Sequence, residues 1–273
     1  MRLTFLGTGG SEGYPATFCR CPRCQTARDI GGPNIRRRTS VLIDDKVLID
    51  FGPDVPASLQ TLGLDLAPVE HLLVTHPHDD HFLPVTLKYR HPRDGAPDLP
   101  TLCVHGGEAS LNMLDHLPFG LDELRASASP ITAGEWFDAG GYRVLPLAAN
   151  HAPGLQAVLY VVMRDGTGVL YATDTGAFRP ESWEALEGLE LGAAVIETTY
   201  WDHEAAAGGQ YHMTIDQAVC HACRLHNIGA LRDEAPVYAT HICHRSLPDH
   251  FSLTERFAGT DMQPAYDGLS VSI

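Results

Sequence analysis

The chain has 273 residues, of which 44% are hydrophobic and 19% charged, a composition that excludes disordered, collagen-like and coiled-coil proteins. This length is compatible with one domain, because single sandwiches and barrels of similar size are common. The net charge of −15, from 19 Lys and Arg against 34 Asp and Glu, argues against a dedicated duplex nucleic-acid-binding protein.

Short runs of β-forming residues recur along the chain and predict one or two sheets. Helical patterns lie between some of them, so the class is α/β or α+β. The clearest helix begins at Thr214, where Thr214 and Gln217 form a capping box, and ends at Gly229. Residues 91–100 are predicted to form a surface loop, and nothing indicates a second domain. The predicted strands are residues 3–6, 41–43, 47–51, 71–74, 102–104, 144–147, 157–162, 169–172, 193–196 and 237–239.

One uncharged apolar stretch, residues 144–163, has the length of a membrane span. It contains two prolines, an asparagine and a histidine, and polar groups are costly in hydrocarbon, so we expect two strands and a loop there. Only four residues separate Arg2 from Gly7, too few for the apolar region of a secretory signal. We therefore expect a cytoplasmic protein without a membrane partner.

The strongest chemical signal is a ligand-rich loop directly after the predicted strand 71–74. His76, His78, Asp80 and His81 lie within six residues there. A loop that leaves a strand end can point His76 and His78 toward one centre and Asp80 and His81 toward another. Imidazole and carboxylate ligands suit zinc, iron or manganese. The alternative, a solvated polar loop, does not account for so many ligands at this spacing.

Three more ligands follow apolar strands in the same way: His151, Asp174 and His241. Each alone could be a cap or an ordinary hydrogen-bond partner. Together with the first loop they supply five histidines and two aspartates. Such a set can hold two metals about 3.5–4 Å apart in a hydrolytic two-metal site.

These residues resemble the metallo-β-lactamase-fold metal hydrolases, whose signature is His-x-His-x-Asp-His. The resemblance implies one domain over residues 1–273, a four-layer αββα sandwich with the metals at one edge. It also implies two divalent metals, for which zinc and manganese are favoured over iron. In the family's pattern one metal is held by His76, His78 and His151, the other by Asp80, His81 and His241, and Asp174 bridges both.

Cys19, Cys21 and Cys24 crowd into six residues, which in a reducing compartment indicates a metal site. A reactive or redox thiol cluster is the alternative. The cluster, at about residues 18–25, resembles the insertion of the PhnP-type phosphoribosyl 1,2-cyclic phosphate phosphodiesterases, where three cysteines and a histidine hold a structural zinc. The family's histidine lies three residues after the last catalytic histidine, the position of His244 here. Such a site is closed and has no open position for chemistry.

His212 precedes the capped helix and matches an additional active-site histidine of the same family; otherwise it would be a surface residue. Proton transfer by such an imidazole contributes roughly 10²–10⁴-fold to a rate. The resemblance implies hydrolysis of a small cyclic ribose phosphate by a metal-bridging hydroxide. Asp80 and His212 are then the catalytic residues. It also hints at a homodimer.

Two other kinds of function compete with this interpretation. A tRNA 3′-processing nuclease, or another small-ester hydrolase, would share the ligands, but the nuclease should carry a basic or glycine-rich arm, and the net charge of −15 counts against it. A non-catalytic metal-binding scaffold would tolerate the loss of ligands, whereas all seven are present. Cys220 and Cys223 have ligand-like spacing but no fourth ligand, and we interpret them as incidental.

Overall fold

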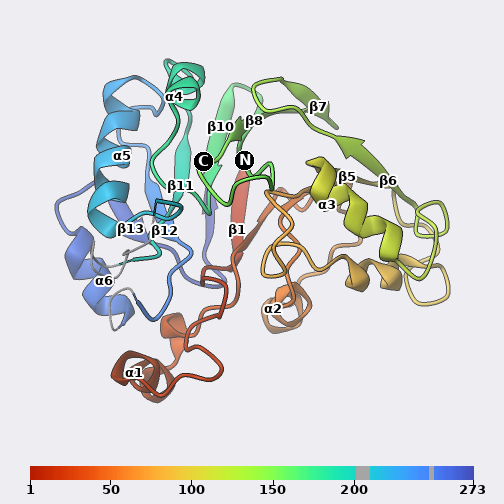
Figure 1. The fold of residues 1–273 in the computed structure, drawn as a ribbon, viewed down its shortest axis with the longest axis horizontal. Coiled ribbons are helices and arrows are strands. Elements are labelled where there is room, and N and C mark those ends of the chain that lie inside the picture. The colour runs from red at the N-terminus through yellow and green to blue at the C-terminus, as the bar shows by residue number, and fades with distance from the viewer. Residues whose placement is uncertain (201–209, 246–248) are drawn as a thin grey trace.

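The computed structural model describes residues 1–200, 210–245 and 249–273. Within these residues two seven-stranded sheets pack face to face, and helices cover the outer face of each. Figure 1 shows the two termini side by side near the centre, where the Met1 ammonium group donates to the Ile273 carbonyl oxygen at 3.0 Å. The single-domain αββα sandwich predicted from the sequence is confirmed.

The first sheet is antiparallel from β14 through β1 and β2 to β3 and parallel from β3 to β6. Its outer face packs against α2 (Val55–Leu62), α3 (Glu108–Asn112) and the 3₁₀ turns η2 (Pro84–Arg90) and η3 (Met113–His116). In spatial order its strands are β14 (Ser270–Ser272), β1 (Arg2–Gly7), β2 (Ser40–Ile43), β3 (Val47–Ile49), β4 (His71–Leu73), β5 (Leu102–Gly106) and β6 (Ala126–Pro130).

The second sheet is antiparallel from β7 to β10 and parallel from β10 to β13. Its outer face packs against α4 (Pro180–Leu186), α5 (Ile215–Asn227) and α6 (His250–Phe257), and α5 begins with the predicted capping box. In spatial order its strands are β13 (Met262–Pro264), β12 (Val237–Thr240), β11 (Ala193–Glu197), β10 (Thr167–Ala172), β9 (Val158–Arg164), β8 (Tyr142–Ala148) and β7 (Phe137–Ala139).

Alternate residues of a strand point to opposite faces of the sheet, so the apolar side chains form three core layers. One lies between the two sheets, and one lies between each sheet and its outer helices. Phe5 and Leu73 of the first sheet and Tyr160 of the second belong to one buried cluster that joins the two sheets. Leu72, one residue away from Leu73, packs instead into the cluster beneath α2 and η2. Neighbouring residues of a strand therefore contribute to the cores on opposite faces of the sheet. None of the described helices is long and apolar enough to cross a membrane.

The direction of the parallel strands determines where the loops that carry the predicted metal ligands come together. The carboxyl ends of neighbouring parallel strands lie at the same edge of a sheet, and β4, β10 and β12 each lead into a ligand loop there. The cysteine-rich insertion continues into α1 (Pro22–Ile30) and η1 (Gly32–Asn34), and α1 lies apart from the four layers in Figure 1.

Candidate metal centre

The first half-site consists of His76, His78, His151 and Asp174. Their ligand atoms all lie within 4.8 Å of one another. His78 Nδ1 lies 2.9 Å from His76 Nε2 and 3.3 Å from His151 Nε2. Asp174 Oδ2 lies 3.6 Å from the Nε2 atoms of both His76 and His151. The structure therefore brings together the three histidines that the family resemblance assigns to one metal and the aspartate that it assigns as the bridge.

The second half-site consists of Asp80, His81, His241 and, again, Asp174. Asp174 Oδ1 lies 3.0 Å from His241 Nε2 and 3.2 Å from His81 Nε2, while Asp80 Oδ2 lies 3.1 Å from His81 Nε2. Asp174 thus turns one oxygen toward each half-site. This is the placement that a bridging ligand needs, and its role as a metal bridge stays a prediction.

The packing of these atoms fits bound cations. His81 Nε2 and His241 Nε2 are buried and form no hydrogen bond of good geometry among the described residues, and each instead lies 3.0–3.2 Å from Asp174 Oδ1. Ligand nitrogens around a tetrahedral zinc lie about 3.3 Å apart, since each is about 2.0–2.1 Å from the ion. The separation of 3.3 Å between His78 Nδ1 and His151 Nε2 matches that spacing, and the separation of 2.9 Å between His78 Nδ1 and His76 Nε2 is somewhat shorter. Imidazole and carboxylate donors of this kind suit zinc, manganese or iron.

The electrostatics of the cluster also favour positive charge. Burial opposes ionisation of Asp174, but His241 and His81 outweigh it and hold its pKa well below the usual range. Burial opposes protonation of His241, but Asp174 and Asp80 raise its pKa to about 10. At His76 burial dominates and lowers the pKa well below the ordinary value. The carboxylates therefore create a site with a strong preference for cations.

Further hydrogen bonds fix the orientation of the ligands. His81 Nδ1 donates to Asp50 Oδ2 at 2.7 Å, and Asp50 also accepts from the backbone N–H of Thr75 at 2.8 Å. His241 Nδ1 lies 2.8 Å from Thr199 Oγ1. Because Nδ1 is engaged in each case, Nε2 faces the centre, as is usual for metal-binding histidines.

Three residues of the centre have a left-handed backbone that non-glycine residues rarely adopt: Asp50 (φ 62°), Asp174 (φ 47°) and His241 (φ 55°). All three lie just beyond a strand end, after β3, β10 and β12. Such conformations cost about 1–3 kcal/mol each and concentrate at functional sites. Gly52 is required nearby, because a Cβ there would lie 2.0 Å from the Asp80 carbonyl oxygen.

His212 lies beside both half-sites. Its ring centroid is 5.1 Å from that of His151 and 5.4 Å from that of His241. Its Nδ1 lies 3.0 Å from Oε1 of Glu197, a fully buried residue at the end of β11. Burial opposes protonation of His212, but Glu197 raises its pKa above the ordinary value. This places the predicted catalytic histidine at the centre instead of on the surface.

Glu197 contacts the candidate centre through His212, and our sequence reasoning missed it. It also accepts from the backbone N–H groups of Thr175 at 2.6 Å and Met213 at 3.2 Å. These bonds satisfy a carboxyl group that would be costly to bury alone. The available signal was an acidic residue closing the otherwise apolar strand Ala193–Glu197.

The predicted cysteine site also assembles. Ligand atoms of Cys19, Cys21, Cys24 and His244 all lie within 4.8 Å of one another. His244 Nδ1 lies 3.1 Å from Cys19 Sγ and 3.5 Å from Cys24 Sγ, near the separation of about 3.6 Å expected around a tetrahedral zinc. Glu12 Oε1 lies 3.3 Å from the other ring nitrogen of His244, which would orient it.

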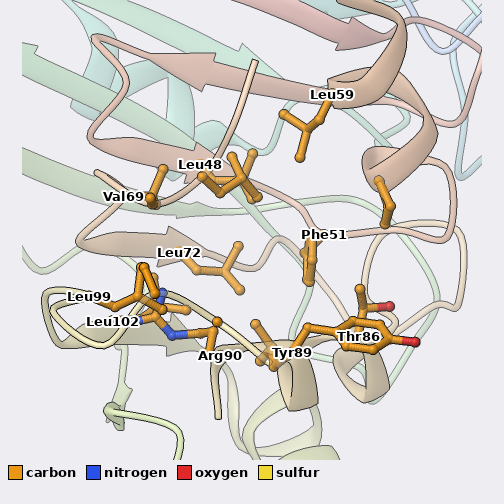
Figure 2. Close-up of a pocket in the computed structure, with 16 residues that line it drawn as sticks. Leu48, Phe51, Leu59, Val69, Leu72, Thr86, Tyr89, Arg90, Leu99 and Leu102 are labelled. Carbon is orange, nitrogen blue, oxygen red and sulfur yellow. The ribbon is translucent and has the colours of Figure 1, made fainter. Parts of the chain in front are cut away.

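Two cavities differ in their relation to the centre. An apolar cavity of about 310 Å³ lies between α2 and η2, and no predicted metal ligand lines it. Figure 2 shows Leu48, Phe51 and Leu72 among its lining residues. A second cavity, of about 480 Å³, is lined by the metal-ligand candidate His151, by Gln156 and by Arg179. Of these two cavities, only the second is lined by a predicted metal ligand of the centre.

Comparison with known proteins agrees with this architecture. Residues 45–242 match the family described as the beta-lactamase superfamily domain. No curated protein sequence matches the chain significantly.

Solved structures resemble the whole chain. A diphosphatase from the PhnP family has a TM-score of 0.76 and 25% identity, covering 100% of this chain and 97% of its own. Zn²⁺-bound PqqB from Methylobacterium extorquens has a TM-score of 0.77 and 15% identity, covering 100% of both chains. The short form of human tRNase Z has a TM-score of 0.68 and 17% identity, covering 100% of this chain and 99% of its own. The chain therefore belongs to the beta-lactamase superfamily, as a hydrolase of the metallo-β-lactamase fold.

Proposed function

We propose that the protein is a dinuclear-metal phosphodiesterase that hydrolyses a small cyclic ribose phosphate, of the phosphoribosyl 1,2-cyclic phosphate type. The observation that carries this proposal is Asp174, which turns one carboxylate oxygen toward each of two half-sites. His212 lies beside both of them. This arrangement supplies a two-metal centre and a proton donor within one cluster.

The centre would bind two divalent metals, which when present lower the pKa of bound water and polarise a phosphate oxygen. The chain's own contribution is to hold the ligands, with Asp50 and Thr199 fixing His81 and His241. Because Glu197 engages Nδ1 of His212, Nε2 is the nitrogen left to donate a proton to the leaving oxygen. Asp80, with one carboxyl oxygen near His81, would help to position the attacking water.

Two observations support a small substrate. The cavity beside His151 has the volume of a small-molecule site and includes the cationic side chain of Arg179. The net charge of −15 disfavours long polyanions, whose binding depends on neutralising many phosphates. The similarity to a PhnP-family diphosphatase agrees with a phosphate ester as substrate. A homodimer in the cytoplasm, without duplex nucleic acid or membrane as partner, completes the proposal.

A tRNA 3′-processing nuclease is the second candidate, because the similarity to human tRNase Z extends over the whole chain. At 17% identity this similarity concerns the fold and does not identify a substrate. The acidic charge is the observation that favours the small ester.

The two candidates differ in the substrate that the purified, metal-supplemented enzyme prefers. We expect kcat/KM for a ribose cyclic phosphate, or for a simple chromogenic phosphodiester, to exceed that for precursor tRNA by orders of magnitude at moderate salt. Efficient trimming of precursor tRNA with little action on the small esters would instead assign the chain to the nucleases. Hydrolysis of neither would favour a metal-binding scaffold.

A further inference from the structure

A second group of histidine and cysteine side chains lies away from the candidate metal centre, on the first sheet. His71 of β4 pairs in register with Cys103 of the neighbouring parallel strand β5. His105 lies two residues beyond Cys103 and pairs with Leu73, whose side chain packs between the two sheets. Because alternate strand residues share a face, the three side chains project from the same face of the sheet, toward the other sheet.

The three side chains converge to within ligand distance. A ring nitrogen of His71, a ring nitrogen of His105 and the Cys103 sulfur all lie within 4.8 Å of one another. His71 Nδ1 and His105 Nε2 are 3.1 Å apart. Two nitrogens on one tetrahedral zinc lie about 3.3 Å apart, so the pair already has nearly the spacing that an ion requires.

The surroundings hold the two imidazoles in place. His105 is 3% exposed, and the ring of Phe137, from β7 of the other sheet, stacks on it with a centroid distance of 4.8 Å. A Cβ at Gly140 would lie 2.7 Å from His71 Nε2, so a glycine there leaves room for the ring. Both side chains are therefore packed in defined positions.

A neutral hydrogen bond between the imidazoles is the simplest alternative, and it explains only part of the arrangement. It accounts for the 3.1 Å contact but not for the convergence of the Cys103 sulfur on the same point. Zinc bound by both rings and by the Cys103 sulfur would account for the convergence of all three side chains.

We propose that His71, Cys103 and His105 form an additional zinc site, separate from the seven ligands of the candidate centre and from the cysteine-rich insertion. Two imidazoles and one thiolate match the borderline-soft character of zinc, and three protein ligands leave one position for water. This proposal does not depend on the proposed phosphodiesterase activity.

The charge state of the two histidines agrees with this site. Burial lowers the pKa of His105 to about 4 and that of His71 below its ordinary value. Both rings are therefore neutral at pH 7 and offer a lone pair without releasing a proton. Only the Cys103 thiol would lose a proton when zinc binds. Asp138 and Glu70 lie near enough to act electrostatically on His71 and would partly offset the added positive charge.

Zinc here would connect β4 to β5, and β4 is the strand that leads into the first ligand loop. β4 ends at Leu73, only three residues before His76, and His105 lies beside Leu73 in the sheet. A bound ion would hold the strand that leads into the first ligand loop. We therefore expect it to raise the thermal stability of the folded protein.

Alkylation of individual cysteines tests the site, because Cys103 is half-buried and reports on its own environment. The rate of N-ethylmaleimide modification at each cysteine is measured by peptide mass spectrometry, in zinc-loaded protein and after treatment with a chelator. We expect zinc to slow modification of Cys103 by at least about tenfold. Cys220 and Cys223 are exposed and are the matched controls, whose rates should not change.

Two variants separate direct ligation from general stabilisation of the fold. In His71→Gln or His105→Phe, zinc should no longer protect Cys103, elemental analysis should find one zinc fewer per chain, and zinc should still protect Cys21. The phenylalanine keeps the stacking on Phe137, so this variant guards against loss through misfolding. Unchanged modification of Cys103 on adding zinc, or protection that persists in both variants, would overturn the proposal.

Discussion

Asp174→Asn is expected to abolish phosphodiester hydrolysis and to reduce the metal content of the protein. The carboxylate faces both half-sites, with oxygens 3.0 Å from His241 Nε2 and 3.6 Å from His76 Nε2. An amide carries no negative charge and offers only one oxygen, so it cannot bridge two cations. Asparagine tolerates the left-handed backbone of this position, which should keep the variant folded. Initial rates measure the loss of hydrolysis, elemental analysis measures the metal content, and circular dichroism checks that the variant is folded.

Asp233→Asn is the matched control for this substitution. Asp233 is exposed in the loop before β12, and its replacement should leave the rate and the metal content at wild-type values. Wild-type turnover by Asp174→Asn would refute a bridged two-metal centre in this chain.

His212→Ala should lower kcat for a small cyclic phosphodiester by roughly 10²–10⁴-fold, the usual contribution of general acid–base catalysis. The metal content should not change, because His212 is not among the seven predicted ligands. Its ring lies beside His151 and His241, where it can reach the leaving oxygen. Steady-state kinetics with elemental analysis measure both effects.

Two further variants accompany His212→Ala. Glu197→Gln changes the partner of His212, and His116→Ala is a surface control. The glutamine keeps a hydrogen-bond acceptor but loses the charge that favours protonated His212, so we expect a smaller loss of kcat than in His212→Ala. His116 is exposed and its removal should have no effect. An unchanged kcat in His212→Ala, or loss of metal from it, would show that the residue is not a proton donor.

The sequence predicted the strands that are buried on both faces, because these are apolar throughout. Val169–Ala172 and Ala193–Ile196 lie within β10 and β11, and their residues are buried. β6 and β14 were missed because they lie at the edges of the first sheet and are rich in serine, which carries no hydrophobic period.

The ligands of the candidate centre could be predicted for a related reason. His151, Asp174 and His241 each lie at or just beyond a strand end, which is a local signal in the sequence. Glu197 also ends a strand, but a lone acid gave no indication that it would contact His212.

The group of His71, Cys103 and His105 depends on the register of β4 against β5, which no local pattern specifies.

A metal titration of the wild-type protein tests the dinuclear centre most directly. Protein from which weakly held metal has been removed is titrated with Mn²⁺, an ion that prefers the imidazole and carboxylate centre over the thiolate site. Bound manganese and the initial rate of hydrolysis of a ribose cyclic phosphate are recorded at each step. We predict a rate that rises until two manganese ions are bound per chain and then stays constant. Full activity with one ion or none, or no hydrolysis with two ions bound, would contradict a two-metal phosphodiesterase.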